Sequence, residues 1–245
     1  GAPAPRGGGA APAPPPRRGP PPPAPRGGGG PGPRPHDLLR LARPEQLVPA
    51  PCGEQSPPAW VHACLERTPW VVVRRAPRPR ALVPVGVRGP RRGQRWAAYL
   101  PPEAVRETVR PEDLAAGAAP RDLPVFHAIT DLAALSRPAW APAWGPGGSA
   151  GFELATGHPA AHEGSDLDLV VRVPRPVPPA AVAGLLRTLS GLPVRVDVQL
   201  QSPWGGFAAA EYARHTGEVL LRTDAGPCLV ADPWHRPATA RPEPR

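Results

Sequence analysis

Proline and glycine crowd the first 35 residues of the chain, and this confines a folded structure to the remainder. Residues 1–35 consist of 14 Pro, 10 Gly, 6 Ala and 5 Arg. A segment of this composition has too little apolar surface to offset the entropy lost on ordering, so we expect a disordered tail with polyproline-like stretches. The 210 residues that follow are long enough to bury a sizeable core.

The charge of the foldable part is modest, although the whole chain carries a net charge of +9. All 29 basic residues are arginine, and residues 36–245 contain 24 of them against 20 acidic residues. This small excess, without a nucleic-acid-binding signature, argues against a nucleic-acid partner. No run approaches 18 apolar residues, so we expect no membrane span and no membrane partner. Three widely spaced cysteines and the lack of an apolar leader predict a cytoplasmic protein.

The first half of the foldable chain is rich in expected strands. Residues 36–41 have the character of a helix or a capped turn. Runs of apolar and β-branched residues predict strands over 70–75, 81–87 and 95–100. The segment 103–120 is polar, then rich in Ala and Gly, and two prolines punctuate it. We place a boundary there and expect a smaller, strand-rich N-terminal domain over 36–118.

Helices and strands alternate in the second half, which predicts an α/β (α+β) domain over 119–235, followed by a flexible end at 236–245. We expect a small mixed sheet flanked by helices. Prolines near the starts and glycines after the ends predict helices over 123–135, 150–156, 179–190 and 207–215. Strands are expected over 167–173 and 194–201, with a terminal hairpin that turns at 224–226.

Two aspartates stand at the start of the strand expected over 167–173. Side chains two apart in a strand share a face, so Asp166 and Asp168 point the same way while the leucines beside them enter the core. Asp197 lies on the polar face of the later strand. If the two strands are neighbours, three carboxylates converge on one edge, and their hard oxygens suit Mg²⁺. Such an edge can hold two metal ions and stabilise both oxygens of an in-line displacement at phosphorus.

Gly148 and Ser149 supply the second half of the expected site. Small residues at a turn that enters a helix let backbone N–H groups approach a phosphate, and a helix N-terminus favours negative charge. Pro146 removes a backbone donor just before them. The phosphate contacts are therefore expected at Gly148 and Ser149.

These motifs resemble a known superfamily. Gly-Ser, a helix, Ser-Asp-Leu-Asp-Leu and a third Asp on a later strand are similar to the polymerase-β-type nucleotidyltransferases. The longer pair of segments Trp144-Gly-Pro-Gly-Gly-Ser-Ala-Gly-Phe-Glu-Leu-Ala-Thr-Gly157 and Ser165-Asp-Leu-Asp-Leu169 resembles the malonate decarboxylase holo-acyl-carrier-protein synthases, which are phosphoribosyl-dephospho-CoA transferases. Further similar segments are Arg34-Pro-His-Asp-Leu38, Trp70-Val-Val-Val-Arg-Arg75, Leu123-Pro-Val-Phe-His127, Val196-Asp197 and Val219-Leu-Leu-Arg-Thr223. The resemblance covers roughly residues 34–235 and implies a nucleotidyltransferase domain in the second half.

The resemblance also implies a reaction. Its family transfers phosphoribosyl-dephospho-CoA from 2′-(5″-triphosphoribosyl)-3′-dephospho-CoA to a serine of the acyl-carrier subunit of malonate decarboxylase, and pyrophosphate leaves. Asp166 and Asp168 would hold Mg²⁺ or Mn²⁺ on the triphosphate, and Asp197 would help hold the metal that faces the serine and draw off its proton. Gly148 and Ser149 would bind the phosphates.

Because the chain has no lysine, arginine must bind the charge of the leaving group. The candidates are Arg172, Arg195 and Arg214 in the second half, and Arg74 and Arg75 in the first. The Arg-rich stretch between residues 67 and 95 would help bind the phosphates of CoA or steer an acidic carrier protein.

Two other functions stay open at this point. The first is a nucleotidyltransferase that uses ATP or CTP on another acceptor, because the three carboxylates act on phosphates and metals that all these substrates share. The second is a non-catalytic basic module that binds nucleic acid, which predicts strongly salt-dependent DNA binding.

Overall fold

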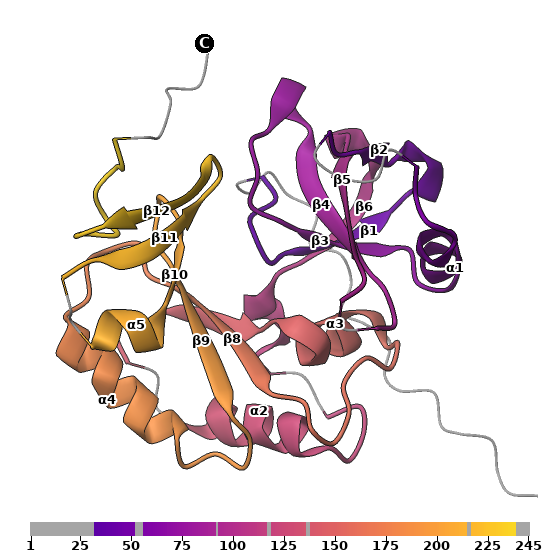
Figure 1. Cartoon of the computed structure of the whole chain (residues 1–245). Coiled ribbons are helices and arrows are strands. Elements are labelled where there is room, and N and C mark those ends of the chain that lie inside the picture. Colours follow the sequence, from indigo (N-terminus) through magenta and orange to yellow (C-terminus); the bar gives the residue numbers. More distant parts are fainter. Residues whose placement is uncertain are drawn as a thin grey trace, which may run out of the picture.

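The described chain forms two six-stranded sheets (Figure 1). A cleft lined by residues of both sheets lies between them. The computed structural model describes residues 32–51, 56–91, 93–116, 119–135, 138–214 and 217–238. Residues 1–31 of the tail expected over 1–35, and residues 239–245 of the flexible end expected over 236–245, lie outside the described residues. No helix in the described part of the chain is long and apolar enough to cross a membrane.

The first sheet is antiparallel, with the strand order β2-β5-β4-β3-β1-β6. One of its faces is a core of valines and leucines that α1 covers through Val61 and Leu65. Its regular elements are β1 (Leu38–Leu41), β2 (Val48–Pro49), α1 (Ala59–Arg67), β3 (Trp70–Val73), β4 (Val83–Arg88), β5 (Arg95–Leu100) and β6 (Val105–Val109), with the 3₁₀ helices η1 (Pro44–Gln46), η2 (Pro79–Ala81), η3 (Pro102–Ala104) and η4 (Pro111–Leu114). The strands expected in this half are confirmed.

The structure differs from the expectations for the first half in two places. Residues 38–41 form β1 and not a helix or capped turn, because Leu39 and Leu41 are buried on either side of exposed Arg40 and the segment pairs with β3 and β6. The segment 103–120, in which we place the domain boundary, contains β6 and η4, where no element is expected from the sequence. Half-buried and exposed residues alternate along β6, as suits a strand at the edge of a sheet.

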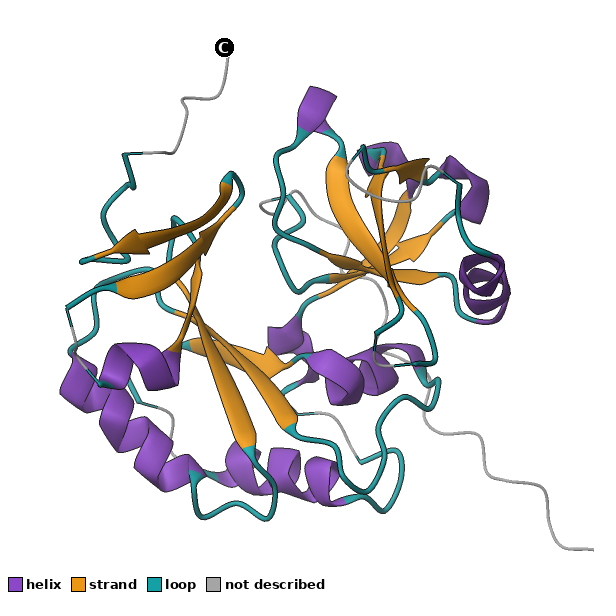
Figure 2. Ribbon diagram, in the orientation of Figure 1, coloured by secondary structure: helices purple, strands orange, loops and turns teal. Residues whose placement is uncertain are grey.

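The second sheet is mixed, with the strand order β12-β11-β10-β9-β8-β7. Only β8 and β9 pair in parallel, and α4 makes the crossover between them. Helices α2, α4 and α5 cover one face of the sheet, whereas α3 lies between this sheet and the first (Figure 2). Its elements are α2 (Pro124–Ala134), β7 (Ala143–Pro146), α3 (Gly148–Thr156), β8 (Leu167–Arg172), α4 (Pro179–Leu189), β9 (Val196–Gln201), β10 (Gly206–Ala208), α5 (Ala209–Ala213), β11 (Val219–Thr223) and β12 (Gly226–Val230).

Most elements expected in the second half are present. Helices α2, α3 and α4, strands β8 and β9, and the hairpin of β11 and β12 are confirmed. The helix expected over 207–215 is wrong in its first part, because Phe207 belongs to β10, pairs with Leu200 and is fully buried in the core. The expected α/β (α+β) class with a strand-rich N-terminal part is confirmed. The domain limits 36–118 and 119–235 stay predictions.

Candidate active site

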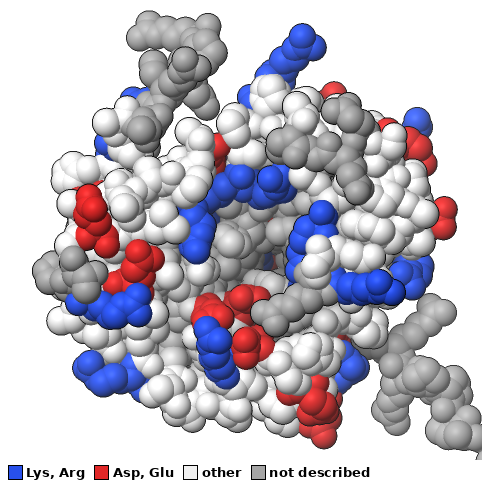
Figure 3. All heavy atoms as spheres, in the orientation of Figure 1, with Lys and Arg blue, Asp and Glu red and all other residues white. Residues whose placement is uncertain are grey.

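The cleft between the two sheets brings together residues that lie far apart in the sequence. It has a volume of about 570 Å³. Arg74, Arg88 and Arg95 line its wall on the first sheet, and Gly148 and Asp168 line the opposite wall. Figure 3 shows a hollow at the centre of this face, with basic side chains along its rim and acidic side chains below it. One of the three expected carboxylates, Asp168, therefore lies in the wall of a cavity.

Asp168 and Asp197 occupy paired positions on the parallel strands β8 and β9. Paired positions of neighbouring strands present their side chains on the same face, with the backbones about 4.8 Å apart. The next residues along, Leu169 and Val198, are buried in the core on the other face. The third carboxylate thus lies beside Asp168, on the polar side of the sheet.

Asp166 directly precedes β8 and is exposed. The adjacent backbone is fixed, because the Leu167 N–H donates to the Arg195 carbonyl at 2.9 Å and the Ser165 hydroxyl accepts from the His162 N–H at 3.0 Å. Among the described residues no three His, Cys, Asp or Glu side chains are grouped closely enough to hold a metal ion. The three predicted carboxylates therefore border one edge, but they do not form a closed set of ligands.

The start of α3 packs directly on the Asp168 carboxylate. Gly148 has a φ of +56°, and a Cβ at this position would stand 1.8 Å from Asp168 Oδ2. The Gly147 N–H donates to the Asp168 carbonyl at 2.8 Å, which fixes the helix start against β8. Ser149 follows as the second residue of α3 and is half-buried. Gly148, one of the two predicted phosphate contacts, thus lies directly against the Asp168 carboxylate.

Glu153 anchors the segment that leads from α3 to Asp166. Its side chain is 2% exposed and accepts from the Arg121 guanidinium at 2.6 and 2.8 Å and from the Ala160 and Ala161 N–H groups at 2.8 and 2.9 Å. Burial by itself raises the pKa of Glu153, but the hydrogen bonds from Arg121 and the two N–H groups lower it overall. The ionised carboxylate therefore ties down the loop before β8.

The two arginines predicted to bind phosphate have protein partners. The Arg172 side chain is 12% exposed and pairs with Glu112 at 2.9 Å and Asp37 at 3.3 Å. Arg195 is 71% exposed and pairs with Asp197 at 2.9 Å. A phosphate-binding role for Arg172 and Arg195 stays a prediction, and Arg195 is the one that stands beside a predicted catalytic carboxylate.

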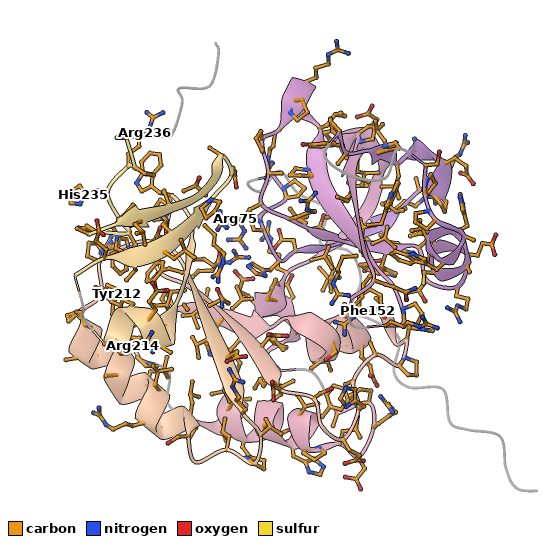
Figure 4. All side chains as sticks on the ribbon, viewed as in Figure 1. Arg75, Phe152, Tyr212, Arg214, His235 and Arg236 are labelled. Carbon is orange, nitrogen blue, oxygen red and sulfur yellow. The ribbon has the colours of Figure 1, made fainter. Side chains whose placement is uncertain are left out.

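Other arginine candidates lie in different places. Figure 4 shows Arg75 between the two sheets and Arg214 on the side of α5 away from the cleft. Arg75 donates to the Gln201 side chain and pairs with Asp224 at 3.4 Å, so it bridges the two halves. Of the candidates on the first sheet, Arg74 lines the cleft.

Sequence reasoning missed several residues of the cleft. His36 lines it with a φ of 76°, and its Nε2 lies 3.2 Å from the Gln201 side-chain nitrogen. Burial, helped by the charge of Arg172, lowers the pKa of His36 to about 4, so the imidazole is neutral near pH 7. No local pattern indicates this placement. A signal did exist for Arg88, because Arg88 stands two residues after Gly86 on β4 and residues two apart in a strand point to the same face.

The comparisons with known proteins identify the family. Residues 34–111 match the family described as phosphoribosyl-dephospho-CoA transferase MdcG N-terminal domain, and residues 113–233 match the corresponding C-terminal domain. A phosphoribosyl-dephospho-CoA transferase of Pseudomonas aeruginosa is 45% identical over 83% of this chain and 94% of its own length. A protein of the same name from Azotobacter vinelandii is 40% identical over 84% of this chain and 96% of its own length. No solved structure matches the chain.

The folded part of the chain therefore belongs, over both sheets, to the phosphoribosyl-dephospho-CoA transferase family. The protein is a transferase, as the motifs around Ser149 and Asp166 predict.

Proposed function

We propose that this enzyme transfers phosphoribosyl-dephospho-CoA from 2′-(5″-triphosphoribosyl)-3′-dephospho-CoA to a serine of the acyl-carrier subunit of malonate decarboxylase. The serine oxygen forms a bond to the first phosphorus of the triphosphate. The bond from that phosphorus to the bridging oxygen breaks, and pyrophosphate leaves with its electron pair. The observation that carries the proposal is the pairing of Asp168 with Asp197 on neighbouring strands, where Asp168 lines the cleft against the start of α3.

The residues of the site have separate roles in this proposal. Gly148 and Ser149 offer backbone N–H groups at a helix start to the phosphate chain. Asp197 accepts the proton of the serine. Arg195 balances the charge of Asp197, with which it pairs at 2.9 Å. Arg172 acts on phosphate in this proposal only if it releases Glu112 or Asp37.

A divalent cation fits the chemistry of the donor atoms. Asp166, Asp168 and Asp197 offer only carboxylate oxygens, which Mg²⁺ and Mn²⁺ prefer. Because the described carboxylates do not stand as a closed set of three, the ion would complete the set together with phosphate oxygens of the substrate. When bound, it would neutralise charge that develops on the phosphate oxygens.

The test is the intact mass of the acyl-carrier subunit after incubation with enzyme, triphosphoribosyl-dephospho-CoA and Mg²⁺. We expect the mass to rise by one phosphoribosyl-dephospho-CoA group. Asp168→Asn and Asp197→Asn should each reduce the rate at least 100-fold, because each removes a charge that faces the reacting phosphate. Asp131→Asn, at an exposed position of α2, is the matched control and should leave the rate unchanged.

Three results would contradict this proposal. Equal rates for Asp168→Asn and the unmodified enzyme would remove the carboxylates from the chemistry. A mass gain on another acceptor with ATP or CTP, and none on the carrier subunit, would indicate a different nucleotidyltransferase. Strongly salt-dependent DNA binding that ignores Asp168→Asn would instead favour a nucleic-acid-binding module.

A further inference from the structure

Three arginines of the first sheet share the face that lines the cleft. Arg88 on β4 and Arg95 on β5 occupy paired positions, so their side chains lie next to each other on one face. Arg74 follows the end of β3 and lines the same cleft. Together these three residues form what we call the arginine wall.

The arginine wall concentrates positive charge without matching carboxylates on its own sheet. None of the ion pairs among the described residues involves Arg74, Arg88 or Arg95. Like charges directly opposite each other on neighbouring strands destabilise a sheet. The pKa of Arg88 is lowered overall by burial and by the charge of Arg95, and the charge of Asp168 across the cleft opposes this shift. An anion between the walls would offset this repulsion.

Small residues keep the floor of the cleft open between the arginines. Gly86 pairs with Val72 on one side and with Ala97 on the other, and all three line the cleft. The Arg74 Cδ lies 3.5 Å from the point where a Cβ of residue 86 would stand, so the Arg74 side chain runs over this glycine. A larger side chain at position 86 would occupy the space over which Arg74 extends.

The opposite wall faces the arginines with the start of α3 and the Asp168 carboxylate. Guanidinium groups bind phosphate through planar, paired hydrogen bonds, and three of them match a chain of several phosphates better than a single anion. Because the arginines line a cavity, they favour a small anion that enters the cleft over a protein that covers the surface.

We infer that the arginine wall binds the phosphate chain of the substrate and holds it across the cleft from Asp168. The inference rests on the proposed function for the identity of the substrate. It assigns the first sheet a direct part in substrate binding, so that the site is complete only when both sheets contribute to it.

The experiment measures binding by calorimetry, with inorganic tripolyphosphate in one arm and 3′-dephospho-CoA in the other. Arg88→Ala and Arg95→Ala should each weaken the binding of at least one of these two probes ten-fold or more, and Arg88→Lys should recover part of the loss. Arg106→Ala, exposed on β6, removes the same charge elsewhere and should change the affinity less than two-fold. Thermal unfolding of each variant identifies any that fail to fold, and Arg88→Lys then carries the test.

The two arms identify which phosphates the arginine wall binds. A loss confined to tripolyphosphate assigns it to the triphosphate, and a loss confined to 3′-dephospho-CoA assigns it to the diphosphate of CoA. Unchanged affinity for both probes in folded Arg88→Ala and Arg95→Ala would overturn the inference, as would variants that weaken only the binding of the carrier subunit.

The inference and the proposed function can fail separately. If no phosphoribosyl-dephospho-CoA reaches the carrier subunit, but tripolyphosphate still binds in an Arg88-dependent way, only the proposed function fails. If transfer occurs with the same KM in Arg88→Ala, only the inference fails.

Discussion

His36 and Asp37 are adjacent in the chain, and their ionisation has opposite effects on stability. Burial is the main cause in both cases, and it lowers the pKa of His36 from 6.5 to about 4 and raises the pKa of Asp37 from 3.8 to about 6. Between pH 4 and 6.5 the unfolded state binds more protons at His36, so this residue makes stability rise with pH. At Asp37 the folded state binds more protons, so stability falls with pH between about 4 and 6.

We expect the two effects nearly to cancel in the unmodified protein. Each corresponds to about 3 kcal/mol at 1.36 kcal/mol per pKa unit. Asp37→Asn should therefore make the free energy of unfolding rise more steeply from pH 4 to 6.5 than in the unmodified protein, and His36→Gln should make it fall from pH 4 to 6. Urea unfolding at several pH values measures these slopes. If the free energy of unfolding changed with pH at the same slope in all three proteins, the opposite effects of His36 and Asp37 would be contradicted.

At the scale of elements, the contact between α3 and β8 depends on one glycine. The structure has two glycines with similar positive φ at the two ends of α3, Gly148 with +56° and Gly157 with +70°. Nothing lies within 4 Å of a Cβ at Gly157, whereas a Cβ at Gly148 would meet the Asp168 carboxylate at 1.8 Å. A residue with a side chain would be strained by the positive φ at either position, but only at Gly148 would its Cβ also meet a neighbouring side chain.

Alanine substitutions at Gly148 and Gly157 distinguish the effect of backbone strain from the effect of displacing the Asp168 carboxylate. Gly157→Ala should lower the free energy of unfolding by about 1 kcal/mol, the cost of a positive φ, and leave transferase activity intact. Gly148→Ala should also push Asp168 out of place and reduce the rate of transfer at least 100-fold. Initial rates and urea unfolding of both variants test this. Equal activity in the two variants would mean that Asp168 does not need its position against α3.

At the scale of the whole molecule, Arg172 ties the second sheet to the first half of the chain. It reaches Glu112 in η4, Asp37 before β1 and the Pro35 carbonyl. A third core, to which Leu38, Trp70 and Phe152 contribute, lies between α3 and the first sheet. The ion pairs of Arg172 and the apolar packing of the third core thus hold the two walls of the cleft at a fixed separation.

Arg172→Met should destabilise the protein by about 3 kcal/mol or more, because it leaves the buried Asp37 carboxylate without its charged partner and removes one of the two arginines that pair with Glu112. Arg175→Met, at an exposed position three residues further on, should change stability by less than 0.5 kcal/mol, as is typical of surface sites. Urea unfolding measures both. A stable Arg172→Met variant with weakened tripolyphosphate binding would instead support the phosphate-binding role predicted for Arg172.

Local patterns in the sequence determined many of the elements and the position of the first carboxylates. Alternation around Asp168 and Asp197 indicated which face of each strand is polar, and prolines and glycines marked the ends of α4 and α3. These signals are readable because a strand repeats every two residues and a helix end favours particular residues. The family resemblance rests on the same local segments, so it too could be stated from sequence.

Only the tertiary structure decided which distant groups meet. Residues 38–41 became a strand through pairing with β3 and β6, although their own composition favoured a turn or helix. Arg172 met the carboxylates of Glu112 and Asp37 across 60 residues or more of chain. The arginine wall came to face Asp168 across 73 residues or more. Such contacts depend on how the two sheets pack against each other. This packing depends on the apolar surface that the whole chain buries, so it cannot be predicted from any short segment.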